Sequence, residues 1–127
     1  PVLDALCDER RWPLALSALS GLAMRTYHVT DERTPHMLFR SVAGIDMPLR
    51  RTSSGVVQLA WTPEATRRTL LEGTRDEVAA GGRTDAQLEL EIAATRVRGW
   101  HYQPHSHVES PEFRGFQDKE GVMSVPL

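Results

Sequence analysis

The run from Thr52 to Gly55 is the part of the sequence whose residue types and position could bind an anion. It follows Pro48, which favours an extended residue before it, and it precedes a short apolar segment that ends near Trp61. Because Thr and Ser are good N-caps, we expect a helix that begins near Ser53. The start of a helix leaves backbone N–H groups unpaired and carries a partial positive charge, and small residues let a carboxylate approach. The segment is therefore either a cradle for a small organic acid or an ordinary capped helix.

A second group of residues has the side chains that bind zinc. These imidazole and carboxylate groups belong to His101, His105, His107, Glu109 and Glu112. On an extended segment His105 and His107 would place both rings on one side, and imidazole with carboxylate suits zinc. Pro104 and Pro111 in the same segment instead favour a solvated loop. A metal site and an exposed loop both fit this insert.

The sequence contains no recognisable catalytic motif. Ser53 and Ser54 lack the Gly-x-Ser-x-Gly turn of serine hydrolases, and no histidine is linked to them by a motif. The single cysteine, Cys7, lies on an expected helix face rather than in the electropositive setting of a reactive thiol. We expect no enzymatic activity, no cofactor and no catalytic residue. An enzyme with Ser53 or Ser54 as its nucleophile is the catalytic alternative.

Length, composition and charge describe one ordinary globular domain. The 127 residues are 40% hydrophobic and 25% charged, which is enough for one buried core. The formal net charge of −2 gives no basic surface of the kind that nucleic acid needs. A lone cysteine excludes an internal disulfide, and no apolar run approaches the roughly 20 residues of a membrane span. We expect a cytoplasmic domain with no membrane partner.

Hydrophobic periodicity predicts strands in the first third, helices in the middle and strands again at the end. The expected helices cover 2–10, 53–61, 63–73 and 84–98. The expected strands are the arms of a hairpin over 14–29 with a Ser20-Gly21 turn, then 37–42, 100–103 and 122–127. A turn is expected at Gly44. This grouping predicts an α+β fold with a mostly antiparallel sheet.

Local signals predict where the later helices begin and end. Thr62 is expected as an N-cap, with Pro63 in the first helical position. Thr84 and Gln87 form a capping box for the next helix, and Gly99 is its C-cap. The inward face of that helix is expected to carry Leu88, Ile92 and Thr95.

Four segments resemble, in the same order, parts of the effector-binding domain of the IclR family of bacterial transcription regulators. They are the signature stretch at 48–60, a first helix at 2–13 (VLDALCDERRWP), a helix at 84–100, and a core strand at 121–127 (GVMSVPL). The Arg11-Trp12-Pro13 triplet and the Phe113–Phe116 region look closest to regulators of phenylpropionate-type aromatic acid degradation. The resemblance implies a GAF-like fold, in which helices flank a central, mostly antiparallel sheet.

The resemblance also implies where a ligand would bind. The backbone N–H groups of Ser53 and Ser54 would hold a carboxylate, and Gly55 would permit close approach. Phe39 and Met47 match an apolar pocket wall and would pack on the body of the ligand, although a place in the core of the sheet is the alternative for each.

Two further residues are candidates for contact with the ligand. His36, near Phe39 on the same expected strand edge, would hydrogen-bond a ring hydroxyl, although an exposed loop histidine is the alternative. Val122 takes a position that is polar in some family members, so that contact is apolar in this chain.

The function implied is ligand sensing and oligomerisation in an IclR-type regulator, with a small carboxylic acid as effector and an aromatic acid as one candidate. By the family's pattern we expect a fragment without the winged helix-turn-helix domain and without the C-terminal end. The family's pattern also implies that the domain forms a homo-oligomer (dimer or tetramer). Contact with DNA would be made only through the missing domain. The alternative is a GAF-like sensory module that binds a metal or another ligand at the His101–Glu112 insert.

Overall fold

The computed structural model describes residues 2–10, 14–30, 44–104 and 122–127 of the chain. Its helices are α1 (Val2–Arg10), α2 (Ser53–Ala60), α3 (Glu64–Gly73), α4 (Asp76–Ala79) and α5 (Asp85–Arg98). Its strands are β1 (Ala15–Ser20), β2 (Ala23–Val29), β3 (Asp46–Pro48), β4 (His101–Gln103) and β5 (Val122–Ser124). This confirms the predicted α+β class. No described helix has the length and apolar character needed to cross a membrane.

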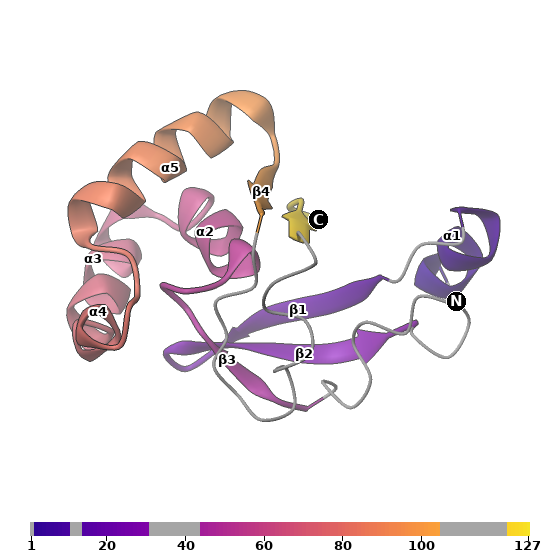
Figure 1. The fold of residues 1–127 in the computed structure, drawn as a ribbon, viewed down its shortest axis with the longest axis horizontal. Coiled ribbons are helices and arrows are strands. Elements are labelled where there is room, and N and C mark those ends of the chain that lie inside the picture. Colours follow the sequence, from indigo (N-terminus) through magenta and orange to yellow (C-terminus); the bar gives the residue numbers. More distant parts are fainter. Residues whose placement is uncertain (1, 11–13, 31–43, 105–121) are drawn as a thin grey trace.

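The described strands pair only in the antiparallel sense. They form one sheet in the order β1-β2-β3 and a second sheet of β4 and β5. Figure 1 shows α2 between α5 and the β1–β2 hairpin, while α1 lies at the far end of the hairpin. Helix α2 contacts α5, both sheets and the hairpin, so it is the element around which the domain is arranged.

The core is built on the apolar face of α2. Because this helix is short and mostly apolar, it can be buried on several sides at once. Its neighbours in the core come from β2, from the turn before α2, and from α3 and α5. The buried cluster comprises Met24, Leu49, Val56, Leu59, Ala60, Leu70, Leu71, Leu88 and Ile92. The predicted inward face of α5 is confirmed, since Leu88, Ile92 and Thr95 are all buried.

The hairpin turn lies one residue later than predicted. Ser20 pairs with Ala23, so the two-residue loop is Gly21-Leu22 and not Ser20-Gly21. Gly21 has φ of 62°, the left-handed conformation that the first loop position of a tight hairpin requires. Glycine therefore occupies that position, and Ser20 remains in β1.

The predicted cap of α3 is also wrong by one residue. The hydroxyl of Thr62 donates to the carbonyl of Gln58 at 2.6 Å and so closes the end of α2. Pro63 takes the N-cap position of α3, with extended backbone angles (φ −55°, ψ 145°). In contrast, Thr84 and Gln87 form the predicted capping box, and Gly99 ends α5 with φ of 85°.

The short helix α4 was not predicted, because four residues carry too little periodicity to be recognised. Its Glu77 carbonyl accepts the amides of Ala80 (3.1 Å) and Gly82 (2.7 Å). A Cβ at Gly82 would lie 2.7 Å from that carbonyl oxygen, so the chain needs glycine there to turn back under α4. The predicted strand over 37–42 lies outside the described residues.

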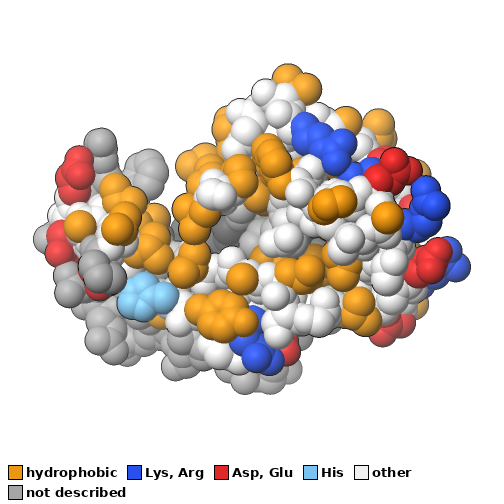
Figure 2. All heavy atoms as spheres, turned by 180° about the vertical axis from the view of Figure 1, so that it is seen from behind, with side chains coloured by type: hydrophobic (Ala, Val, Ile, Leu, Met, Phe, Trp, Pro, Cys, Tyr) orange, Lys and Arg blue, Asp and Glu red, His pale blue; other side chains and the backbone are white. Residues whose placement is uncertain are grey.

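Exposed apolar and charged side chains are unevenly distributed over the surface. Figure 2 shows apolar side chains around a hollow near the middle of one face, with most of the coloured Arg, Asp and Glu side chains gathered toward the helical end. The charged end therefore belongs to α3, α4 and α5, and the apolar middle lies toward the hairpin.

Candidate functional site

The first turn of α2 has two backbone amides without a partner among the described residues. Thr52 caps the helix: its side-chain oxygen accepts the amide of Gly55 at 3.1 Å, and its carbonyl accepts the amide of Val56 at 3.2 Å. Within the described part of the chain, the amides of Ser53 and Ser54 have no hydrogen bond. The first turn also has no acidic side chain to neutralise the helix end. The predicted start of the helix at Ser53 is confirmed, and this end of α2 can accept an anion.

Gly55 is required by the backbone that precedes the helix. A Cβ on Gly55 would lie 1.9 Å from the carbonyl oxygen of Leu49 and 2.9 Å from the hydroxyl of Thr52. We expected the missing side chain of Gly55 to let a ligand approach the backbone closely. In the structure, the group that approaches Gly55 closely is the carbonyl of Leu49. The amide of Gly55 is likewise bound by the Thr52 cap.

Ser53 and His101 are joined in the interior, which sequence analysis did not anticipate. The hydroxyl of Ser53 lies 2.8 Å from Nδ1 of His101 and donates to the His101 carbonyl at 3.1 Å. Both residues are 3% exposed. On its other side the ring faces Glu91 of α5, with 3.7 Å between Nε2 and Oε1. His101 thus links α2, β4 and α5.

The pKa of His101 is lowered from its ordinary value of 6.5, chiefly because burial disfavours the charged ring. The carboxylate of Glu91 acts in the opposite direction, and the guanidinium of Arg83 adds to the lowering. His101 is therefore favoured as a neutral hydrogen-bonding group.

These three side chains include the groups of a serine hydrolase triad but lack its geometry. The Ser53 hydroxyl donates to a backbone carbonyl, and it is buried together with the imidazole. The acid lies 3.7 Å from the ring rather than at hydrogen-bonding distance. A nucleophile must be accessible and have its proton directed at the base, so we interpret this contact as a structural tie.

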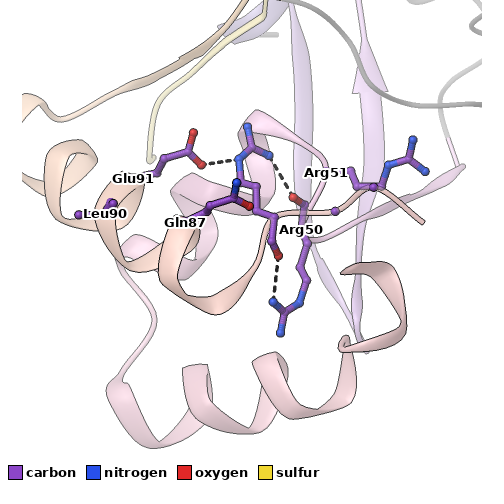
Figure 3. A pocket seen from close by; sticks show the side chains of 8 residues that line it. Arg50, Arg51, Gln87, Leu90 and Glu91 are labelled. Atoms are coloured by element: carbon purple, nitrogen blue, oxygen red, sulfur yellow. Dashed lines mark hydrogen bonds and ion pairs between the residues drawn. The ribbon is translucent and has the colours of Figure 1, made fainter. Parts of the chain in front are cut away.

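An open, arginine-rich pocket of about 410 Å³ lies beside the turn that precedes α2. Its lining residues are Arg50, Arg51, Gly81, Gly82, Arg83, Gln87, Leu90 and Glu91 (Figure 3). Arg83 is paired with Glu91 and donates to the Arg50 carbonyl at 3.0 Å and to Gln103 at 2.9 Å. The guanidinium of Arg83 is thus used by the protein itself.

Arg50 is fully buried and also structural. It donates to Thr74, to the Arg83 carbonyl and to the Leu71 carbonyl at 2.9, 3.0 and 2.6 Å, and it pairs with Asp85 at 2.7 Å. Its backbone amide donates to Glu77 at 2.8 Å. Burial raises the pKa of Glu77, although the Arg50 amide and charge act in the opposite direction. Arg50 therefore joins α3, α4 and α5 around one buried cation.

Two of the remaining predicted ligand residues, Met47 and Val122, lie in short strands. Met47 is half-buried in β3, opposite Met24 of β2. Val122 lies in β5, opposite Gln103. None of the predicted ligand residues that the structure describes lines the arginine-rich pocket. Phe39 and His36 lie outside the described residues.

Of the residues in the predicted histidine insert that could bind a metal, the structure describes only His101. His101 is a buried strand residue engaged with Ser53, and not part of a solvated loop. His105, His107, Glu109 and Glu112 lie outside the described residues. Among the residues that are described, no group of three or more His, Cys, Asp or Glu side chains could hold a metal ion.

Comparison with known proteins gives one family. A family model described as "Bacterial transcriptional regulator IclR C-terminal" matches residues 1–110. Similar solved structures include an IclR family transcriptional regulator from Brucella abortus (24% identity, TM-score 0.60), covering 80% of this chain and 39% of that one. Another is the C-terminal domain of the E. coli regulator KdgR (22% identity, TM-score 0.60), and the match covers 84% of this chain and 61% of that one.

A third structure, the Agobacterium tumefaciens repressor BlcR, is 19% identical with a TM-score of 0.56, covering 81% of this chain and 39% of that one. The present chain thus spans 39–61% of the length of these structures. Likeness at this level of identity establishes the shared fold.

Proposed function

Because the chain belongs to the family of bacterial transcriptional regulator IclR C-terminal domains, we propose that it senses a small carboxylic acid for a transcription regulator. The family is one of regulators and not of enzymes. In this proposal the acid binds at the N-terminus of α2, and DNA is contacted through a separate domain. The domain itself assembles into a homo-oligomer.

The observation that carries the proposal is the pair of amides at Ser53 and Ser54. Both lie in the first turn of a helix whose other early amides are satisfied by Thr52. Two adjacent N–H donors at the positive end of a helix match the two oxygens of a carboxylate. The residues of that first turn include no Asp or Glu. A free carboxylic acid is therefore the ligand class we favour.

The body of the ligand is proposed to be apolar and aromatic. Met47 precedes this turn in β3 and offers an adaptable thioether side chain. Phe39, His36 and Val122 complete the proposed set of ligand contacts. An aromatic acid of the phenylpropionate type fits a donor pair combined with an apolar wall.

Signalling would follow from differential binding. A ligand shifts an equilibrium only if it binds one arrangement better than the other. Helix α2 is tied to β4 through Ser53 and His101, and it packs on α5. Occupation of the amide pair would thus bias several elements together, and with them the spacing of the DNA-binding domains.

Calorimetric titration with a panel of aromatic and keto acids, each beside its primary amide, tests the proposal. We expect acids to bind and the amides to fail, because an uncharged ligand loses the charge-assisted hydrogen bonds. A panel in which no acid binds, or in which acids and amides bind alike, would contradict the carboxylate assignment.

One matched pair of variants isolates the backbone donor. Ser53→Pro removes the amide proton at the first helical position, where proline is well accepted. Thr52 already has the extended angles (φ −117°, ψ 149°) that a following proline requires. Ser53→Ala removes the same hydroxyl but keeps the amide. We expect Ser53→Pro to weaken acid binding about tenfold or more relative to Ser53→Ala, and equal affinities would exclude the Ser53 amide.

A further inference from the structure

Helix α5 has a second apolar face, opposite the one that it buries. Ala86, Leu90, Ala93 and Val97 follow one another at intervals of four, three and four residues, so they form one stripe along the helix. Leu90 is 76% exposed and Val97 is 87% exposed, and both alanines are exposed as well. The buried residues Leu88, Ile92 and Thr95 lie on the other side of the helix. We call the stripe formed by Ala86, Leu90, Ala93 and Val97 the outer stripe.

We propose that the outer stripe is a self-association surface, on which α5 of a second copy of this chain packs in an antiparallel orientation about a twofold axis. This surface would serve the homo-oligomerisation that is part of the proposed function, and in that respect the proposal rests on it. It does not depend on which ligand the domain binds.

The alternation of small and large residues supports the antiparallel orientation. In that orientation Leu90 lies level with the partner's Ala93, and Ala86 lies level with the partner's Val97. Each large side chain then meets a small one, which allows the two helices to approach closely. A parallel pairing would instead place Leu90 against the partner's Leu90.

The charges that flank the stripe select the same orientation. At about 100° per residue, Asp85, Glu89 and Arg96 lie along one side of the outer stripe. In an antiparallel pair this side of one helix lies next to the same side of the partner helix. The partner's Arg96 then lies between Asp85 and Glu89. In a parallel pair this side would instead face the partner's other side, where Arg98 lies close in level to Arg96 and no cation of the helix lies level with Asp85 or Glu89, which is less favourable.

These flanking charges keep the capacity to pair across an interface. Asp85 and Glu89 contact Arg50 and Arg67 within the chain, yet their side chains remain 55% and 54% exposed. Arg96 is exposed and donates through Nε to the Ala60 carbonyl at 2.6 Å, which leaves the two terminal nitrogens of its guanidinium available. The charged side chains that make contacts within the chain can thus also form ion pairs with the charged side chains of a second α5.

The interface is limited to one helix of 14 residues, so the association is weak. Sedimentation velocity on the 127-residue chain, from about 10 µM to about 1 mM, should show a concentration-dependent dimer. Val97→Glu should weaken this dimer by at least about tenfold, because it buries a charge against the partner's Ala86. Val2→Glu, at a 74% exposed valine of α1, is the matched control and should leave the dimer unchanged. A monomer at every concentration, or a dimer unaffected by Val97→Glu, would overturn the proposal.

Cysteine cross-linking tests the orientation, in a chain in which Cys7→Ser removes the native thiol. The double variant Ala86→Cys, Val97→Cys should form a disulfide-linked dimer, since the two positions lie level across the antiparallel pair. Ala86→Cys alone should not, because its copy lies about 16 Å away along the helix, beyond the about 7 Å that a disulfide spans. Linkage of the single variant, or failure of the double variant, would overturn the antiparallel arrangement. Neither result would alter the ligand titrations, so the two proposals fail separately.

Discussion

The hydroxyl oxygen of Ser53 lies 2.8 Å from Nδ1 of His101, which joins the first residue of α2 to the first residue of β4. The same hydroxyl donates to the His101 carbonyl, so both of its bonds serve the interior. The side chain of Ser53 therefore holds the helix end in place, while its backbone amide has no hydrogen-bond partner among the described residues. These two parts of one residue can be tested separately.

The serine hydroxyls differ in what they contribute to stability. Ser53→Ala removes a buried hydroxyl and leaves the ring nitrogen and carbonyl of His101 without it, so we expect a loss of about 1–3 kcal/mol in the free energy of unfolding. Ser54→Ala should cost less than about 0.5 kcal/mol, because its hydroxyl is half-buried and lies 3.5 Å from Thr52. Urea titration of both variants measures the difference, and equal losses would refute the tie.

Burial of His101 predicts a loss of stability in mild acid. The folded state lowers the pKa of the ring below 6.5, so the unfolded chain binds more protons once the pH falls below that value. Stability is fully present above pH 6.5 and declines as the pH falls toward the folded pKa, by at most about 1.4 kcal/mol per pH unit for one proton. His101→Asn should flatten the dependence between about pH 7 and pH 5. Parallel profiles for the variant and the original chain would argue against this group.

Arg50 should matter far more than the acid that it pairs with. Arg50→Ala removes the donors from three acceptors, two of them in buried hydrogen bonds, so we expect a loss of about 3 kcal/mol or more in the free energy of unfolding. Asp85→Asn should cost less than about 1 kcal/mol, because Asp85 is half exposed and water can replace it. Chemical denaturation compares the two, and a larger effect of Asp85→Asn would show that the ion pair dominates.

Gly55 and Gly73 offer a test of close packing. A Cβ at position 55 meets the backbone oxygen of Leu49 at 1.9 Å, and that backbone cannot move without displacing the start of α2. Gly55→Ala should therefore cost about 2 kcal/mol or more. At Gly73 the nearest atoms, at 2.9 and 3.0 Å, are the ends of the flexible Leu22 side chain, and alanine favours the helix. Thermal unfolding should show Gly73→Ala close to neutral, and a similar loss in both variants would contradict this explanation.

Local chemistry accounts for what could be predicted from the sequence. The capping box at Thr84 and Gln87, the Gly99 cap and the start of α2 are set by residues within one turn of each other, so spacing alone predicts them. Thr62 misled the prediction because a threonine hydroxyl can equally donate back to the preceding helix.

Long-range contacts account for what could not be predicted. Ser53 and His101 are 48 residues apart, and nothing near either residue signals the other. Arginine is rarely buried, and nothing near Arg50 in the sequence signals the acceptors from α3 and from the turn before α5 that surround it in the interior. At the candidate site, the family resemblance indicated the amides of Ser53 and Ser54, whereas only the structure shows Gly55 accommodating Leu49.

The central claim, a carboxylate held by the amides of Ser53 and Ser54, is tested most directly by amide chemical shifts. In ¹H–¹⁵N correlation spectra of the 127-residue chain, titration with 3-phenylpropionate should shift the Ser53 and Ser54 amides most, saturably, and the matched primary amide should not shift them. Saturable shifts elsewhere, with these two amides unmoved, would contradict the account.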